Sequence, residues 1–217
     1  PDGERVDPDV APPAVTGTPY REAITSRFFV LVTVGYVLAL GSQVGGIQQL
    51  VKLVEERTDA DTAALATLVL AGTSVIARLI GGRIVASVRM IPFTATLACL
   101  QVVAMVWLAY AMSATALFGA ILLFGATIGN ILMLQPLLIA ERFGVLDYPR
   151  IYSRAQFLGL VGTAGGPLLL GWLYDAAGGY RASYVVAGVL SLCGAIASMF
   201  AGPAEQPSVR QPEEVAA

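Results

Sequence analysis

One arginine lies inside a long apolar run, and its chemistry needs the most explanation. Residues 62–77 carry no charge, Arg78 follows them, and the next basic residues are Arg83 and Arg89. A cation inside a membrane span costs roughly 2.5–3.5 kcal/mol on insertion scales, so a chain keeps one where it faces protein, water or an anion. We therefore take Arg78 as the first candidate binding residue. Two alternatives stay open: its side chain reaches the nearby membrane surface, or it pairs with an acid in a loop.

Of the amides in the other apolar runs, three are the next candidates for substrate binding: Gln43, Asn130 and Gln156. Each can hydrogen-bond a substrate from the wall of a cavity. The alternative for each is a hydrogen bond between helices, which is typically worth under about 1 kcal/mol in a membrane protein. We keep both interpretations and favour the interhelical bond.

Two further groups of residues are candidates for conformational roles. The triplet Gly165, Gly166 and Pro167 lies in the middle of an apolar run, where it should weaken and kink a helix, so we expect packing and hinge residues. Glu141, Arg142 and Arg154 belong to the connector 141–154, which combines charged and aromatic residues. We expect them to form salt links that close one end of the molecule. The alternative is a solvated loop held by anionic lipid.

Catalytic chemistry is poorly represented in this chain. It has no histidine, no acid inside any apolar run, no metal-ligand cluster, no glycine-rich phosphate loop and no nucleophile beside a base. The balance of 13 basic and 15 acidic residues leaves no basic patch for nucleic acid. We therefore expect neither an enzyme nor a bound cofactor or metal.

The elements that position these residues follow from the charge pattern. Hydrophobic residues make up 56% of the chain and charged residues 13%, against about 25% charged in soluble domains. Uncharged stretches of about 20 residues or more predict membrane-spanning helices. We predict an all-α membrane protein whose bundle covers residues 20–201, with spans at about 28–51, 63–85, 91–111, 116–138, 155–174 and 184–200. Residues 1–19 and 202–217 are polar and are predicted to be disordered.

An even number of spans places both ends of the segment on one side, and the positive-inside rule selects the side. With both ends in the cytoplasm, the inner side holds most of the basic residues, namely Arg5, Arg21, Arg27, Arg83, Arg89, Arg142, Arg150, Arg154 and Arg210. The outer side then holds Lys52, Arg57 and Arg181. The expected location is therefore the cell (inner) membrane, with cytoplasmic termini and the charged connector 141–154 on the cytoplasmic side.

The segment 165–188, GGPLLLGWLYDAAGGYRASYVVAG, resembles helices 11 and 12 of the major facilitator superfamily. The residues that match that pattern are Gly166, Pro167, Gly171, Leu173, Asp175, Gly178, Tyr180, Tyr184 and Gly188. Arg78 followed by Gly82 is similar to the end of helix 8 in that superfamily. Within it, the combination most resembles the monocarboxylate transporters and the oxalate–formate antiporters. The resemblance covers Arg21 to Gly202 and implies helices 7–12, with residues 1–19 as the central cytoplasmic loop and an N-terminal six-helix half missing.

The resemblance implies a secondary transporter that works by alternating access, in which two halves rock about a central site. Arg78 matches the arginine that holds the substrate carboxylate in these families, and a guanidinium offers a fixed fork of donors to such a group. The implied substrate is a small organic anion, with a proton or a counter-anion as coupling partner. Three positions depart from the pattern: Ser74 replaces an aspartate, the span 155–174 lacks a basic residue, and Ala86 and Ser87 replace a loop acid.

Two other functions remain open at this point. Superfamily members share the Gly-Pro and Arg-Gly patterns, so a drug or hydrophobic-compound exporter is the alternative within transport. A membrane scaffold or sensor that keeps the fold without transporting is the alternative outside it.

Overall fold

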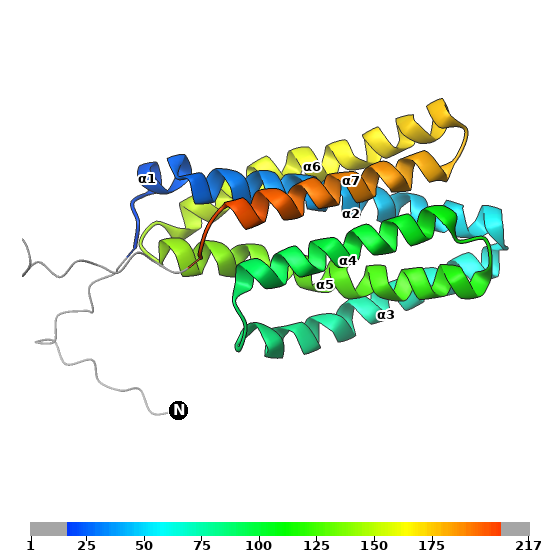
Figure 1. Cartoon of the computed structure of the whole chain (residues 1–217), viewed down its shortest axis with the longest axis horizontal. Coiled ribbons are helices and arrows are strands. Elements are labelled where there is room, and N and C mark those ends of the chain that lie inside the picture. The colour runs from blue at the N-terminus through cyan, green and yellow to red at the C-terminus, as the bar shows by residue number, and fades with distance from the viewer. Residues whose placement is uncertain (1–16, 205–217) are drawn as a thin grey trace, which may run out of the picture.

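The structure, a computed structural model, describes residues 17–204 as a bundle of helices that run back and forth along one long axis (Figure 1). The predicted loop 1–19 and tail 202–217 lie mostly outside the described residues. Every regular element within residues 17–204 is a helix. The helices are α1 (Tyr20–Thr25), α2 (Arg27–Arg57), α3 (Ala60–Val85), α4 (Met90–Tyr110), α5 (Ala114–Phe143), α6 (Tyr148–Ala177) and α7 (Tyr180–Phe200).

All six predicted spans are helices, which confirms the all-α prediction. The six helices α2 to α7 are each long and apolar enough to cross a membrane. The molecule is therefore a multi-pass membrane protein by the length and composition of its helices.

The helices extend beyond the predicted spans, by the largest margins in three places. α2 continues through Lys52 and Glu55 to Arg57, and α5 continues seven residues beyond Pro136 to Phe143. α6 begins at Tyr148, so the predicted connector 141–154 shrinks to residues 144–147. The predicted spans were placed on the apolar runs, and a helix continues past such a run wherever its backbone groups stay hydrogen-bonded.

Local signals fix where the helices begin and end. The Ser26 hydroxyl accepts a hydrogen bond from the Phe29 amide and caps α2, and the Asp59 carboxylate accepts one from the Thr62 amide and caps α3. Gly144 (φ 68°) and Gly178 (φ 69°) end α5 and α6 in a backbone conformation that favours glycine.

The helices differ sharply in how deeply the bundle buries them. α2 packs on α6 and α7, α4 packs on α5 and α7, and α3 packs mainly on α5. In its most apolar stretch, α2 is 67% buried and α5 is 61% buried, but α3 is 17% buried and α6 is 22% buried. α2 and α5 are thus central, whereas α3 and α6 are apolar helices with one face covered.

Glycines bring α2 and α6 into direct backbone contact. Gly41 and Gly45 on α2 meet Gly162 and Gly166 on α6, and a side chain at any of the four would strike backbone of the other helix. Both pairs have the four-residue spacing that lets membrane helices approach closely. α6 continues unbroken through Gly165, Gly166 and Pro167. Gly166 is a packing residue, whereas the hinge role expected for this triplet stays a prediction.

Candidate functional site

Arg78 lies on α3, seven residues before the helix ends at Val85, or about 10 Å along the axis at 1.5 Å per residue. Its Nε donates a hydrogen bond to the Gly129 carbonyl on α5 across 3.1 Å. No carboxylate among residues 17–204 forms an ion pair with it. The side chain is exposed at the margin of the α3–α5 contact, so the outer nitrogens of its guanidinium are available to an anion.

Small residues of α5 set the position of α3 beneath Arg78. A side chain at Gly125 would strike the Leu70 carbonyl at 2.9 Å, and one at Gly129 would strike the Ser74 carbonyl. These contacts hold the two backbones together in the turns of α3 that precede Arg78. The guanidinium is thus carried by a rigid helix pair and not by a loop.

Two of the predicted binding amides bridge helices. Gln43 on α2 donates through Nε2 to Gln101 Oε1 on α4 across 2.9 Å, and both residues are almost fully buried. Asn130 on α5 donates through Nδ2 to the Ala77 carbonyl on α3 across 3.1 Å, and its Oδ1 lies against Gly81. Both amides thus form the interhelical hydrogen bonds that the sequence analysis favoured over substrate binding.

The third amide, Gln156, is exposed on α6. Each of the two least buried helices carries small and polar residues along one flank, at helical spacing. On α3 this flank holds Thr67, Ala71, Ser74, Arg78 and Gly82, and on α6 it holds Gln156, Thr163, Pro167 and Gly171. We call these the polar flanks of α3 and α6.

The other exposed flank of each helix consists of large apolar side chains. On α3, Ile76 and Leu79 are 61% and 66% exposed, and on α6 Phe157 and Leu168 are 62% and 75% exposed. Such side chains suit lipid tails. Arg78 therefore stands apart from the surface best suited to lipid, whereas Gln156 lies one turn before Leu160, which is 60% exposed.

The predicted gating charges lie at one end of the bundle, where α1 and the α3–α4 and α5–α6 connectors meet. We call it the arginine end, because Arg21, Arg27, Arg83, Arg89, Arg142, Arg150 and Arg154 gather there. Arg142 lies over the Phe28 ring at 5.5 Å, and Arg154 lies over the Phe157 ring at 6.0 Å. Whether Glu141, Arg142 and Arg154 close a gate stays a prediction.

Asp147 ties the segment before α1 to the α5–α6 connector. Its Oδ2 accepts a hydrogen bond from the Tyr20 amide at 2.8 Å, and its Oδ1 lies 3.8 Å from Arg150. The Arg150 guanidinium in turn lies over the Tyr20 ring at 4.8 Å. The Thr18 amide adds a hydrogen bond to the Phe143 carbonyl at 2.8 Å.

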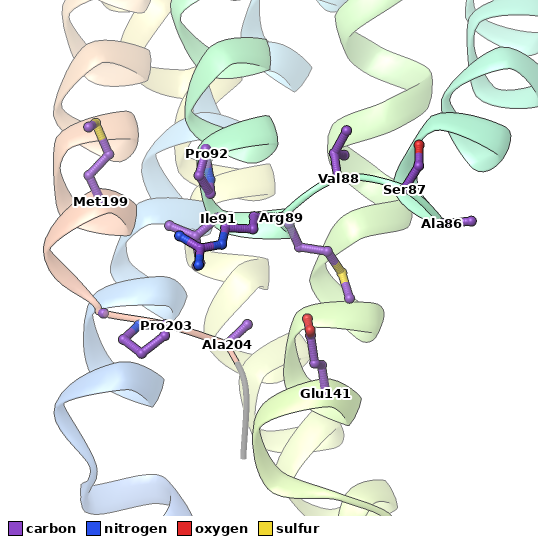
Figure 2. Close-up of a pocket in the computed structure, with 12 residues that line it drawn as sticks. Ala86, Ser87, Val88, Arg89, Ile91, Pro92, Glu141, Met199, Pro203 and Ala204 are labelled. Carbon is purple, nitrogen blue, oxygen red and sulfur yellow. The ribbon is translucent and has the colours of Figure 1, made fainter. Parts of the chain in front are cut away.

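A cavity of about 560 Å³ opens at the arginine end beneath the start of α4. Arg89 and Glu141 are its charged residues, and Figure 2 shows the Glu141 side chain directed into it from α5. Arg78 does not line it, so this cavity is separate from the candidate anion site.

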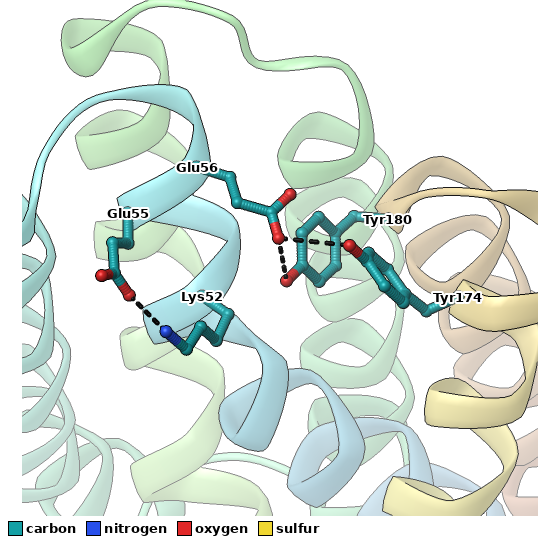
Figure 3. A network of polar contacts seen from close by, with 5 residues as sticks. All are labelled: Lys52, Glu55, Glu56, Tyr174 and Tyr180. Carbon is teal, nitrogen blue, oxygen red and sulfur yellow. Dashed lines mark hydrogen bonds and ion pairs between the residues drawn. The ribbon is translucent and has the colours of Figure 1, made fainter.

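The opposite end of the bundle holds a polar network that the sequence reasoning missed (Figure 3). Glu56 Oε1, near the end of α2, accepts hydrogen bonds at 3.2 Å from Tyr174 of α6 and from Tyr180 of α7. The two tyrosine rings lie 4.5 Å apart. Tyr174 and Tyr180 are 118 and 124 positions from Glu56, so no local sequence pattern indicates that they meet.

Arg57 makes a second connection from the same turn of α2. Its guanidinium donates to three carbonyls at the end of α4, those of Leu108 (2.7 Å), Ala109 (3.2 Å) and Ala111 (2.6 Å). These carbonyls have no partner within the helix, so the guanidinium caps α4. The last turn of α2 thus contacts α4, α6 and α7 through two adjacent side chains.

No protein-family model matches the chain, and no curated protein matches it either. Any functional assignment therefore rests on the residues and their geometry. The arrangement offers one cation with free donors at the edge of a rigid helix pair, and no group positioned for bond-breaking chemistry is evident among the described residues near it.

Proposed function

We propose that this chain is the C-terminal half of a secondary active transporter of the major facilitator superfamily, which moves a small organic anion by alternating access. Arg78 binds the substrate carboxylate, and a six-helix half completes the site. The main support is the guanidinium of Arg78: its Nε donates to the Gly129 carbonyl, and its other N–H groups remain able to donate to an anion.

The physical case starts from the cost of the charge. An unpaired guanidinium inside a membrane span is unfavourable, and a carboxylate neutralises it through two parallel hydrogen bonds. Gly129 holds one nitrogen, which orients the planar group before the anion arrives. Pre-orientation lowers the entropy lost on binding.

The polar flanks of α3 and α6 support a second half as the partner. Glycine in an exposed helix costs roughly 1 kcal/mol relative to alanine. Yet Gly82 on the polar flank of α3 and Gly171 on that of α6 have no neighbour within 4 Å of the position that a side chain would occupy. The stability lost through such a glycine is offset where another helix or a substrate approaches the backbone closely.

The residues around Arg78 bear on which ion could be coupled to transport. Ser74, one turn before it, is the position where the monocarboxylate transporters carry an aspartate. No described span of this chain has an acid at mid-depth. A coupling proton would therefore bind in the other half or travel with the substrate, and anion exchange needs no such acid.

Uptake by the complete transporter in proteoliposomes tests the proposal, with labelled formate, lactate and oxalate as probes. Arg78→Ala should abolish uptake, and Arg78→Lys should lose most of it because an ammonium lacks the planar fork. Arg83→Ala, at an exposed arginine one to two turns away, is the matched control and should retain uptake.

Two results would redirect the assignment. Unchanged uptake in Arg78→Ala would reject this residue as the anion ligand. Failure of the parent protein to move any of the three anions, combined with efflux of a hydrophobic dye, would favour the exporter. Failure to move either class would favour a scaffold or sensor.

A further inference from the structure

The residues just before α1 lie across the α5–α6 connector, and we call residues 17–20 the strap. Gly17 pairs with Gly144 of the connector in an antiparallel bridge. The Tyr20 amide, the first of α1, donates a hydrogen bond to Asp147 Oδ2 at 2.8 Å. The strap thus joins the chain at residue 17 to the residue that precedes α6.

The strap lies this close to the connector because it starts with a glycine. A side-chain carbon at Gly17 would lie 2.7 Å from the Phe143 carbonyl oxygen and 2.9 Å from Leu146 Cβ. Both distances are too short for a carbon atom to occupy without moving its neighbours. A branched side chain at residue 17 would therefore lift the strap from the connector while residue 147 itself stays unchanged.

Asp147 precedes the first turn of α6, yet its side chain does not cap that helix. Ser26, Asp59 and Ser113 have the same position before α2, α3 and α5, and each accepts a hydrogen bond from an amide of its own helix. These three residues have extended backbones, with ψ between 144° and 170°. Asp147 has ψ 19° and makes no side-chain bond to α6. Its carboxylate binds the strap instead.

The start of α6 offers Asp147 an alternative donor. The side chain before a helix accepts a hydrogen bond from the amide of the second or third helical residue. The second residue of α6 is Pro149, which has no N–H, so the donor is the third, Arg150. The Arg150 amide now donates to the main-chain carbonyl of Asp147 at 3.0 Å. Rotation of Asp147 to an extended backbone would bring its carboxylate to this amide.

We propose that the strap and Asp147 form a two-state latch. In the closed state, which is the one described here, the carboxylate holds the Tyr20 amide and the strap lies on the connector. In the open state the strap leaves the connector, Asp147 rotates, and its carboxylate caps α6 through the Arg150 amide. Asp147 accepts a hydrogen bond from a helix amide in both states, so opening costs little beyond the contacts of the strap itself.

The latch couples movement of the chain before residue 17 to the first turn of α6. It is independent of anion transport and of the role of Arg78. Its signature is that the amide protected by the Asp147 side chain changes from Tyr20 to Arg150 when the strap opens. A carboxylate with a purely structural role would protect the Tyr20 amide alone.

Hydrogen exchange resolved to single amides, on the full chain in detergent, tests the latch. In the parent protein, Asp147→Ala should speed exchange at Tyr20 about tenfold and leave Arg150 unchanged, because the Arg150 amide bonds to a main-chain carbonyl. In Gly17→Val, which opens the strap, Tyr20 should exchange fast whether or not Asp147 is present. In that background, Asp147→Ala should instead speed exchange at Arg150 about tenfold.

Tyr20→Pro opens the strap by a second route, because it removes the amide donor. Proline is well accommodated at the first position of a helix. Pro19 already has the extended backbone that a following proline requires, with φ −59° and ψ 145°. In this variant the Arg150 amide should show the same dependence on Asp147 as in Gly17→Val.

Thr18→Val is the matched control, because Thr18 bonds to the connector through its amide, which valine keeps. It should exchange like the parent protein at Tyr20 and Arg150. An Arg150 amide that exchanges independently of Asp147 in both opened variants would overturn the latch, since the released carboxylate would then lie in water. A Tyr20 amide that is unaffected by Asp147→Ala in the parent protein would overturn it as well.

Discussion

Gly162 on α6 lies against the backbone carbonyl of Val37 on α2, so closely that no side chain fits between the two helices. A methyl group at this position would push the helix backbones apart, and overpacking of this kind costs about 1–3 kcal/mol. We predict that Gly162→Ala lowers the thermal stability of the purified protein, measured by the unfolding midpoint in detergent.

Gly165 gives a control within the same helix. It is three residues from Gly162, and nothing lies within 4 Å of where its side chain would be. Gly165→Ala should leave the stability of this bundle unchanged, or raise it by up to about 1 kcal/mol through helix propensity. A larger loss at Gly165 than at Gly162 would contradict the packing described for α6.

Arg57 should contribute through the helix end that it caps. Arg57→Ala leaves the Leu108, Ala109 and Ala111 carbonyls without their side-chain donors, and hydrogen bonds from charged groups are each worth about 1.5–3 kcal/mol. We predict a lower unfolding midpoint and faster hydrogen exchange at the end of α4. Arg57→Lys should recover only part of the loss, because an ammonium cannot span three carbonyls.

Lys52→Ala is the matched comparison on the same stretch of α2. Lys52 forms an exposed ion pair with Glu55, at 2.8 Å, and such pairs contribute about 0–1 kcal/mol. If Lys52→Ala were as destabilising as Arg57→Ala, general loss of positive charge would explain both results and the capping role would be wrong.

Glu56 should hold α6 and α7 against the end of α2. Tyr174→Phe and Tyr180→Phe each remove one hydrogen bond to the same carboxylate oxygen. We predict that each increases the reactivity of a cysteine placed at exposed Asp175 toward a membrane-impermeant thiol reagent, because the end of α6 moves more freely.

Glu56→Ala should reproduce that increase, since it removes both hydrogen bonds together. Glu55→Gln is the control, because Glu55 contacts neither tyrosine. Equal labelling in Glu56→Ala and in the parent protein would show that the network does not restrain α6.

Asp59 should make the start of α3 sensitive to acid. Hydrogen bonds from the Thr62 amide and hydroxyl lower the pKa of this exposed carboxyl group. A lowered pKa means that the folded state favours the charged form. The stability that the charged Asp59 side chain gives to the start of α3 is therefore complete above the ordinary aspartate pKa of about 3.9. It is lost as the pH falls through the lower pKa of the folded state.

Hydrogen exchange at the first turn of α3, compared between Asp59→Ala and the parent protein, measures this effect. The difference should be present at neutral pH and should shrink at pH values below about 4. A difference that stayed constant across this range would mean that the side-chain charge is irrelevant to the cap.

The six spans were predictable because a long uncharged run has few alternatives to a membrane helix. Helix ends were not predictable, since the spans were placed on the apolar runs, and α2 and α5 continue through charged residues beyond those runs. Arg78 was identifiable because one cation in such a run is costly. Its bond to Gly129 was not, because the partner is a backbone carbonyl that carries no sequence signal.

Partners across the bundle were the hardest to foresee. Gln101 is a polar residue in an apolar run and was open to notice, yet its pairing with Gln43 depends on how α2 and α4 are rotated. The sequence indicated that the glycines of α6 serve packing. It did not indicate which of them face α2 and which lie on the open face of the helix. Sequence spacing gives the periodicity of a helix and leaves its rotation undetermined.

The order in which the chain is made bears on the contact between α2 and its late partners. The Tyr184 hydroxyl donates to the Gly46 carbonyl, and these residues are separated by 138 positions. While α3, α4 and α5 are being synthesised, the glycine face of α2 therefore lies in the bilayer without α6 and α7, the helices that later cover it. We expect lipid or an insertion factor to cover that face until the last two spans have been made.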